Sequence, residues 1–386
     1  MSDEPEGGEG MAVPSAPVSD RIKQLIGESE GLSRTDLASS SALAPSTVSQ
    51  LVRQLIEQGE VEETEGESTG GRRPRLLRLR RRPGTLGVAE IGSQHVRLGV
   101  SDGQGRLLGS TELPITIANG PTQVFDTLAE GWSVLRNELD TDEPLRGIGL
   151  ALPGPVNVQR TAVSGAARMP GWTEVDLPAL LTERFGVPAV IENDARAGAI
   201  GEFSQRPDLG DFLYVKAGSG IGGAWMSEGR PYRGALGFGG DLTHTRVPDA
   251  GQLVCSCGNT GCLETVGSGA GIKRLLAAEG IDADSLDELL TMSRNGNAQV
   301  TTRLRTAGGQ LGQVLSAIVN FLNPHTIVVG GSLSSVGAYV AGMRAVIYAD
   351  SLPICTTDLT ITESRSGADA ALLGMTAMIR QTTLTS

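Results

Sequence analysis

The sequence is poor in aromatic residues, cysteine and histidine, and these scarcities narrow what the chain can be. Phe, Trp and Tyr make up 3% of 386 residues, so the core must be built mainly from Ala, Val, Leu and Ile. No stretch approaches the roughly 18 unbroken apolar residues of a membrane span. The first residues are acidic and glycine-rich, without an apolar signal core, and the few cysteines fit a reducing compartment. We therefore expect a cytoplasmic protein without a membrane partner.

Charge is acidic overall but unevenly distributed. The net charge of −12 would by itself argue against a nucleic-acid partner. Residues 1–16 contribute −4, residues 17–82 contribute +1 and residues 83–386 contribute −9. Seven arginines nevertheless lie between Arg72 and Arg82. One local basic element therefore accompanies an otherwise acidic chain.

Three of the four cysteines form the most specific local pattern. They read Cys255-x-Cys257-x4-Cys262, and His244 lies eleven residues before the first. Nearby glycines allow tight turns that bring thiolates together, and three thiolates with one imidazole suit a closed tetrahedral Zn²⁺ site. The alternative is three small buried residues near an unrelated histidine. Because no disulfide pairing explains three cysteines, the pattern favours zinc.

The N-terminal part shows a tail followed by short helical patterns. Residues 1–18 have the composition of a disordered tail. Residues 19–82 contain three short amphipathic stretches, in which Ser33 can cap the second and Pro45 suits the first position of the third. A tight turn joins the second stretch to the third. This arrangement predicts a helix-turn-helix.

The third helical stretch keeps polar side chains off its apolar face. These are short hydrogen-bonding groups and one cation, suited to base edges and phosphates in a major groove. They are Ser46, Thr47, Ser49, Gln50 and Arg53. A small helical bundle with a polar outer face is the alternative.

A predicted hairpin follows, with arginines at its tip. Val61 and Leu76–Leu79 bracket the segment Gly70-Gly71-Arg72-Arg73-Pro74. Arg72 and Arg73 can contact phosphates and enter a narrow minor groove. A charge run is usually a solvated face, but this one directly follows a helix-turn-helix. Residues 19–82 are therefore predicted to be a winged helix that binds double-stranded DNA.

The sequence pattern changes after a linker at Pro83-Gly84, and residues 85–386 have the patterns of strands, glycine turns and helices. A buried strand at 188–191 ends in Glu192-Asn193-Asp194-Ala195, before a helical stretch. Polar groups at such a junction lie at the usual ligand edge of an α/β sheet. Asp194 could be a general base or a hydroxyl acceptor, and Asn193 offers a donor and an acceptor. A helix N-cap cluster explains the same residues equally well.

A glycine-rich segment resembles a nucleotide loop only formally. The strand Leu213–Lys216 is followed by Gly218-Ser219-Gly220-Ile221-Gly222-Gly223, which contains G-x-G-x-x-G. A dinucleotide loop should open a long helix, but the next residues have the pattern of a returning strand. The segment predicts a phosphate-binding or purely structural hairpin. A long helix is expected at Thr301–Leu322, ending before Pro324.

Together these motifs resemble the ROK family (repressors, open reading frames and sugar kinases). The most specific are His244 with the cysteine motif, then Glu192-Asn193-Asp194-Ala195; the glycine loop at 218–223 and Ile327-Val-Val-Gly-Gly331 support them more weakly. The winged helix resembles the regulator branch, because kinases of the family lack it. The resemblance covers nearly the whole chain.

The resemblance implies an α/β fold: an N-terminal winged helix-turn-helix, then an actin-like (ribonuclease H-like) two-lobed domain of the sugar-kinase type. It implies that Asn193 and Asp194 hold sugar hydroxyls, with Asp194 at the position of the base in the kinases. Asp241, His244 and Glu264 would complete the sugar pocket. His244 would give one ring nitrogen to zinc and the other to the sugar.

Several positions depart from the family pattern. The kinases carry an Asp-x-Gly-Gly-Thr phosphate loop, where this chain has Glu90-Ile91-Gly92-Ser93-Gln94-His95. The bulkier side chains should hinder approach of phosphate to backbone N–H groups. Asp241 stands where Glu is usual, and Thr243 replaces a glycine. Arg168 stands where Asn is usual; it predicts an acidic or phosphorylated effector, with a surface or structural arginine as the alternative.

The sequence thus predicts a sugar-responsive transcription regulator, most simply a repressor of carbohydrate uptake or metabolism genes. Its partners would be operator DNA, a sugar or sugar-phosphate effector, and further copies in a homodimer or homotetramer. No catalysis is expected, because the phosphate loop is degenerate. The rival interpretations are an active ATP-dependent sugar kinase carrying a DNA-binding domain, and a zinc-stabilised hub that binds other proteins.

Overall fold

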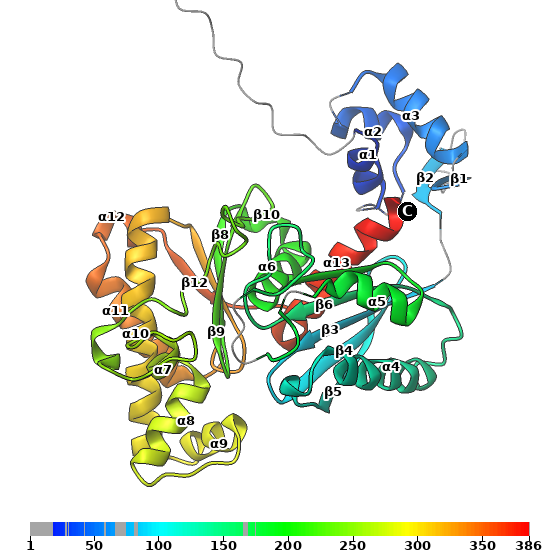
Figure 1. Cartoon of the computed structure of the whole chain (residues 1–386). Coiled ribbons are helices and arrows are strands. Elements are labelled where there is room, and N and C mark those ends of the chain that lie inside the picture. Colours follow the sequence, from blue (N-terminus) through cyan, green and yellow to red (C-terminus); the bar gives the residue numbers. More distant parts are fainter. Residues whose placement is uncertain are drawn as a thin grey trace, which may run out of the picture. The chain divides into compact units, whose positions relative to one another are not determined.

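The chain divides into two compact units, Met1–Arg82 and Pro83–Ser386 (Figure 1). The computed structural model describes residues 18–27, 29, 31–41, 43–57, 59–65, 75–80, 84–164, 169–173 and 175–385. Arg72, Arg73 and Arg168 lie outside this set, as do residues 1–17 of the predicted tail and the predicted hairpin tip at 70–74. Val18, which the sequence analysis assigns to the tail, is instead the first residue of a helix. Among the described residues, none of the helices combines the length and apolar character that a bilayer span needs.

The first unit contains three helices and a two-stranded antiparallel sheet among its described residues. Its elements are α1 (Val18–Gly27), α2 (Arg34–Ser41), α3 (Pro45–Glu57), β1 (Val61–Glu65) and β2 (Arg75–Leu79). The predicted cap of α2 is present: the backbone N–H of Asp36 donates to Ser33 Oγ at 3.2 Å, and Ser33 Oγ donates to the Asp36 carboxylate at 2.7 Å. Leu32 pairs with Leu77 of β2, joining the α1–α2 connection to the sheet.

A small apolar core holds this unit together. Ile22, Leu37, Val48 and Leu77 are fully buried and come from all three helices and the sheet. The apolar face predicted for the third helix is therefore the face that α3 buries. The opposite face of α3 stays available to solvent.

The second unit is built around two five-stranded mixed sheets (Figure 1). The first has the order β5-β4-β3-β6-β7, and the second β10-β9-β8-β11-β12. The strands are β3 (Thr85–Ile91), β4 (His95–Asp102), β5 (Leu107–Pro114), β6 (Leu145–Leu152), β7 (Ala189–Asn193), β8 (Phe212–Ala217), β9 (Ile221–Ser227), β10 (Arg230–Pro231), β11 (Thr326–Gly330) and β12 (Thr360–Glu363). In each sheet an antiparallel hairpin precedes a parallel crossover. We call the parts around these sheets the first and second lobes.

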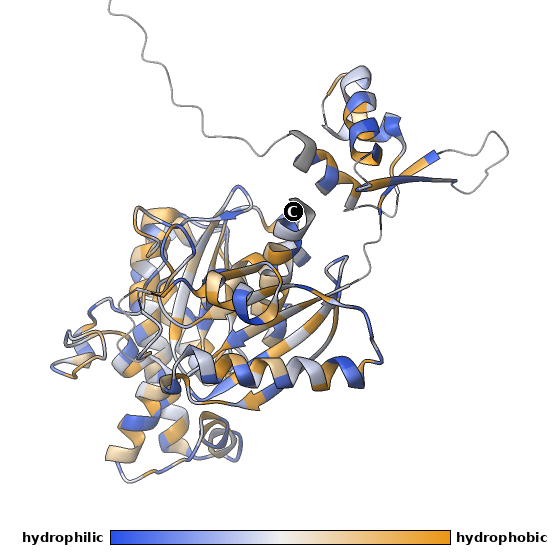
Figure 2. Cartoon of the chain, turned by 45° about the vertical axis from the view of Figure 1, so that its right-hand side comes forward, coloured by the Kyte–Doolittle hydropathy of each residue, from blue (hydrophilic) through white to orange (hydrophobic). Residues whose placement is uncertain are grey.

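Helices cover both faces of each sheet. They are α4 (Pro121–Glu138), α5 (Leu177–Phe185), α6 (Asp194–Gln205), α7 (Glu264–Gly267), α8 (Gly269–Ala278), α9 (Leu286–Arg294), α10 (Ala298–Leu322), α11 (Gly337–Asp350), α12 (Pro353–Thr356) and α13 (Ala370–Thr385). In the first lobe, α4 and α5 pack on one face and α13 on the other. In the second lobe, α10 and α11 cover one face and α6 the other. Both hydrophobic and hydrophilic residues occur along α4, and its buried residues form an apolar stripe, as a half-buried helix requires (Figure 2).

The lobes meet where α6 crosses α13. A Cβ added at Gly201 of α6 would lie 1.9 Å from the carbonyl oxygen of Ala370, and one added at Gly374 of α13 would lie 1.9 Å from that of Ala197. Only glycine permits this backbone approach. A similar crossing joins α10 to α11, where Gly308 faces the carbonyl oxygen of Tyr339. Gly308 therefore does not interrupt the long helix.

The glycine segment after β8 forms a hairpin, as its sequence pattern predicts. β8 pairs antiparallel with β9, which already begins at Ile221. The turn is closed by the backbone N–H of Gly218, which donates to the carbonyl of Gly220 at 2.9 Å. No helix follows this turn, so the segment is not a dinucleotide loop.

Candidate functional site

A cleft of about 1260 Å³ opens between the two lobes. Side chains from both sheets and from the loops that follow their strands line it. It contains every described residue that the sequence analysis assigns to a sugar pocket: Asn193, Asp194, Asp241, His244 and Glu264. The predicted effector residue Arg168 lies outside the described part of the chain.

Asn193 and Asp194 lie where β7 ends and α6 begins. Asn193 is the N-cap of α6, since its Oδ1 accepts from the backbone N–H of Arg196 at 3.1 Å. Its Nδ2 donates to the carbonyl of Gly154 at 3.0 Å and to Asp194 Oδ1 at 3.1 Å. The N-cap role and the place in the cleft therefore coexist in these residues, and the cap fixes their orientation.

The opposite wall is formed by the loop that precedes α7. The backbone N–H of Ile221 donates to Glu264 Oε2 at 3.2 Å, and Thr243 Oγ1 donates to the carbonyl of Ile221 at 2.6 Å. The backbone N–H of Thr243 in turn donates to Asp241 Oδ1 at 2.9 Å. These bonds tie the loop to the start of β9. They present the carboxylates of Asp241 and Glu264 to the cleft from one side.

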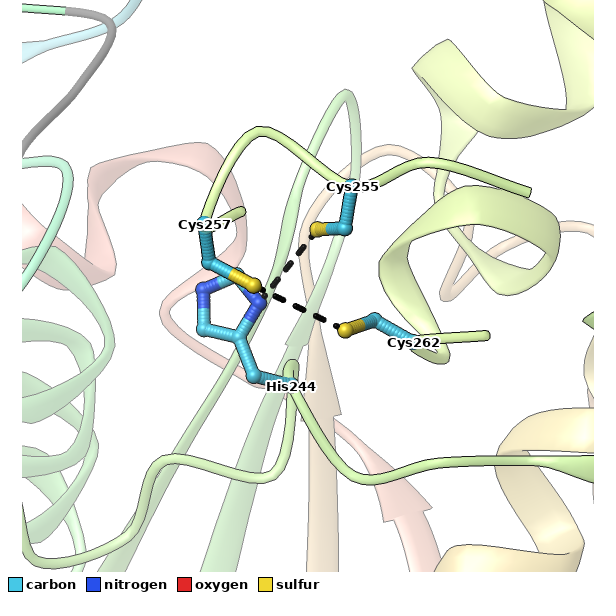
Figure 3. A group of neighbouring side chains, drawn as sticks. All are labelled: His244, Cys255, Cys257 and Cys262. Carbon is cyan, nitrogen blue, oxygen red and sulfur yellow. Dashed lines mark hydrogen bonds between the residues drawn. The ribbon is translucent and has the colours of Figure 1, made fainter. Parts of the chain in front are cut away.

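His244 and the three cysteines converge at one point beside the cleft (Figure 3). Their four ligand atoms all lie within 4.8 Å of one another. Cys255 Sγ lies 3.5 Å from His244 Nδ1, and Cys257 Sγ lies 3.7 Å from Cys262 Sγ. A tetrahedral ion with Zn–S near 2.3 Å and Zn–N near 2.05 Å requires S–N and S–S separations of about 3.6 and 3.8 Å. The donor set and its spacing therefore fit Zn²⁺.

The thiols of this cluster differ in their proton affinity. Burial, together with the neighbouring thiols, raises the pKa of Cys262 to about 12. At the exposed Cys257, desolvation acts in the same direction but is outweighed by a hydrogen bond from the backbone of Asn259 and by contacts with the other thiols, so the pKa falls below its ordinary value. A bound cation would favour the thiolate form of all three.

The cluster of His244 and the three cysteines shares a residue with the cleft. His244 turns Nδ1 toward Cys255, and its ring also lines the cleft. Nε2 lies across the ring from Nδ1. An ion held through Nδ1 would fix the tautomer and orientation of the imidazole, and so the hydrogen bond that Nε2 can offer.

A buried network of ion pairs lies next to the cleft, at the end of β7. Glu192 is fully buried on β7, and its Oε1 accepts from Arg196 Nε at 2.8 Å. Arg233 pairs with its other oxygen. Arg196 also donates to the carbonyls of Gly237 at 2.7 Å and Val156 at 3.2 Å. The two arginines hold the pKa of Glu192 below its ordinary value despite burial, and the network connects the end of β7 to two loops at the cleft.

Across the cleft, Lys216 of β8 contacts two carboxylates. Its Nζ lies 2.6 Å from Asp194 Oδ2 and also pairs with Glu90 Oε1 of β3. The turn after β3 is closed on itself, because the backbone N–H of Gly92 donates to the carbonyl of His95 at 2.8 Å. That N–H is therefore already paired within the turn.

In the first unit, the predicted DNA-contacting residues of α3 share its outer side. Ser46, Thr47, Gln50 and Arg53 are exposed. Ser49 is half-buried, and its carbonyl accepts from Arg34 Nη1 at 3.4 Å. The described side chains therefore leave this face of α3 open.

Comparison with known proteins supplies the family. The family model described as "ROK family" matches residues 85–382. The chain belongs to the ROK family. The xylose repressor of Caldicellulosiruptor bescii is 26% identical over 379 residues, covering 93% of this chain and 94% of that protein. A glucokinase of Halalkalibacterium halodurans is 26% identical over 311 residues, covering 76% of this chain and 94% of the enzyme.

A solved structure confirms the ROK fold. A ROK family transcriptional regulator, homolog of the Escherichia coli MLC protein, superposes with a TM-score of 0.78 at 23% identity, covering 95% of this chain and 96% of that chain. The second unit is thus the two-lobed actin-like α/β fold expected from the sequence. The relatives of this ROK chain include both regulators and kinases.

Sequence reasoning missed charged residues in and near the cleft of this ROK chain that form ion pairs. The sequence pattern places Lys216 only in a strand and gives no role to Arg196 or Arg233. A signal was present for Lys216: it is one of three lysines in the chain and stands in the apolar strand Phe212–Ala217. A cation in a buried strand requires an anionic partner.

Proposed function

We propose that this protein is a DNA-binding transcription regulator that responds to a sugar and represses genes of carbohydrate uptake or metabolism. The observation that carries the proposal is a separate unit of three helices and a two-stranded sheet joined in one chain to a unit with the fold of the sugar kinases. The xylose repressor covers 93% of this chain, whereas the glucokinase covers 76%, a share close to that of the second unit alone. The extra unit distinguishes a regulator from a kinase.

In this proposal the first unit reads the operator. Helix α3 enters the major groove and the arginines of the hairpin tip contact phosphates or the minor groove. Two such units in a homodimer, or in a homotetramer, read two half-sites. The contacting residues are Ser46, Thr47, Ser49, Gln50, Arg53, Arg72 and Arg73.

The second unit binds the effector. The hydroxyls of a sugar are held by Asn193, Asp194, Asp241, His244 and Glu264, which come from both walls of the cleft. Binding favours one closure state of the lobes, and α10 passes this change to the dimer and so to the spacing of the winged helices. A ligand can act in this way only through different affinities for the two states.

A zinc ion held by His244, Cys255, Cys257 and Cys262 is structural in this proposal. The tetrahedral donor set leaves no open position for catalysis. When bound, zinc cross-links the loop between 244 and 262 and fixes the imidazole that faces the sugar. Loss of the ion would therefore weaken the response to sugar without touching the DNA-reading helix.

Sequencing of DNA fragments retained by the purified protein, with and without candidate sugars, tests the function directly. We expect a palindromic operator to be enriched and then released by one sugar or a small group of sugars. Absence of any enriched sequence would refute a regulator of this kind.

An active sugar kinase is the second candidate, because Asp194 places a carboxylate in the cleft at the end of a strand. The occupied N–H of Gly92 argues against it. A coupled assay of ADP release over common hexoses separates the two. Turnover that depends on both sugar and ATP, and is lost in Asp194→Asn, would establish the kinase.

The charge of the effector is a finer part of the proposal. Arg168, a cation where the family pattern has an asparagine, supports an acidic or phosphorylated sugar. Titration with a neutral sugar and its 6-phosphate measures this preference. Equal affinities for the two sugars would contradict a preference for a phosphorylated effector. Arg168→Asn should abolish any preference for the phosphate.

A further inference from the structure

Lys216 lies between two carboxylates that belong to the other lobe. Its Nζ is 2.6 Å from Asp194 Oδ2 and pairs with Glu90 Oε1. Lys216 is on β8 of the second sheet, whereas Glu90 is on β3 of the first and Asp194 follows β7 of the first (Figure 1). All three line the cleft. The two ion pairs therefore cross it.

The Lys216 ammonium group is paired with two carboxylates, but its side chain remains partly accessible to water. A quarter of the Lys216 side chain is exposed, against 17% for Glu90 and 14% for Asp194. Burial opposes its charge, but the carboxylates of Asp194 and Glu90 outweigh burial and raise the pKa of Lys216 above its ordinary value. The group stays cationic at neutral pH.

The point occupied by Nζ is also the point at which a divalent cation would bind. Oxygens of two carboxylates that reach one common atom are the donors that Mg²⁺ and Mn²⁺ prefer. A fixed ammonium there takes up those oxygens and repels a second cation. One of the two negative charges is thus balanced from within the chain.

Asp194 keeps limited capacity for a ligand. Its Oδ1 accepts from the backbone N–H of Ala195 at 2.8 Å and from Asn193 Nδ2 at 3.1 Å, and its Oδ2 accepts from Lys216. A carboxylate has about four acceptor positions, so about one remains for an incoming group. A hydroxyl, which donates one hydrogen bond, suits that vacancy.

We propose that Lys216 is a built-in cation that stands where a divalent metal ion would bind between Glu90 and Asp194 and ties the lobes together across the cleft, so that the cleft takes a polyol without a divalent ion at this point and without nucleotide. The inference deepens the proposed function and rests on it for the class of ligand. The cation itself is tested without sugar or DNA, so failure of either part is recognised separately.

The test is binding of Mn²⁺ to the zinc-loaded full chain, measured by electron paramagnetic resonance of the free ion. Wild type should show no Mn²⁺ site in the cleft. Lys216→Met should bind Mn²⁺ on the order of tenfold or more tighter, because two carboxylates lose their cation. Asp194→Asn added to Lys216→Met should abolish the gain, and Lys216→Arg should behave as wild type.

Lys273→Met is the matched control, because Lys273 also lines the cleft but donates to the backbone carbonyl of Asp284 at 2.6 Å rather than to a carboxylate. It should gain no Mn²⁺ affinity. A wild-type site that involves Asp194, or a folded Lys216→Met variant without increased affinity, would overturn the proposal.

A measurement on wild type covers the case in which Lys216→Met does not fold. The chain has three lysines, Lys23, Lys216 and Lys273, so ¹⁵N spectra of their ammonium groups are simple to assign. The Lys216 signal should persist in Mn²⁺ and should be lost or shifted in Glu90→Gln. Broadening of that signal by Mn²⁺ to the same extent as the Lys273 signal would contradict a cation that excludes the metal.

Discussion

The Glu192→Gln substitution tests whether the negative charge of Glu192 stabilises the ion-pair network next to the cleft. The substitution preserves shape and removes one negative charge from a fully buried site. Arg196, whose side chain is 3% exposed, and Arg233 then lose their common counter-charge. Breaking a buried pair from one side costs about 3–5 kcal/mol. We expect the lower end, about 3 kcal/mol, because the amide oxygen can still accept one hydrogen bond.

Thermal unfolding followed by circular dichroism measures this cost. For a unit of this size, about 3 kcal/mol corresponds to a melting temperature lower by about 5 °C. Glu183→Gln, at an exposed position of α5, is the control and should change little. A Glu192→Gln variant as stable as this control would refute the view that the charge, and not the shape, holds the network.

The same variant carries a pH signature. The folded pKa of Glu192 lies below its unfolded value, so its contribution is present above the unfolded pKa, about 4.3, and is lost as pH falls through the folded pKa. Glu192→Gln should therefore lose less stability than wild type on acidification below about pH 4.3. Parallel acid-unfolding curves would contradict the sign of the shift.

Three further predictions concern the metal, the lobe junction and DNA. Cys257→Ser should reduce zinc content, measured by mass spectrometry of the purified protein, from about one per chain to near zero; a metal-free variant that keeps its full sugar response would contradict a bracing role. Gly201→Ala should destabilise the protein by about 1–3 kcal/mol, because its Cβ would lie 1.9 Å from the carbonyl oxygen of Ala370. Gly337→Ala is the control and should be neutral, since Gly337 has open space around it. Equal melting temperatures of the two variants would contradict the close crossing of α6 and α13. Arg53→Ala should weaken DNA binding in fluorescence anisotropy and reduce its salt slope by about 1, and an unchanged slope would remove the phosphate contact.

Local sequence patterns predicted the elements whose signal is short-range. The α3 helix follows from Pro45 and a regular apolar face, and the cap of α2 follows from Ser33 and Asp36, three residues apart. The β8–β9 hairpin follows from glycines succeeded by a strand pattern instead of a helix. In each case the residues that fix the structure are within one turn or one hairpin of one another.

One helix with a glycine in its middle was not predicted. The α11 helix (Gly337–Asp350) contains Gly342, which an isolated helix would disfavour. Its Cβ would meet the carbonyl oxygen of Arg305 at 2.0 Å, so the glycine is required by the crossing with α10. Propensity alone counts that residue against the helix, because the compensating contact comes from a segment far away in the sequence.

The same distinction between local and long-range signals applies to the candidate site. The sequence by itself identified the candidate metal ligands, because three of them lie within eight residues and their chemistry is specific, and it determined which polar residues follow β7. Only the tertiary structure decided that Lys216 faces Glu90 and Asp194, and that Glu192 pairs with Arg196 and Arg233. The reason is physical: a ligand type can be read from one residue, but a charge pair exists only once two distant strands have been brought to the same edge.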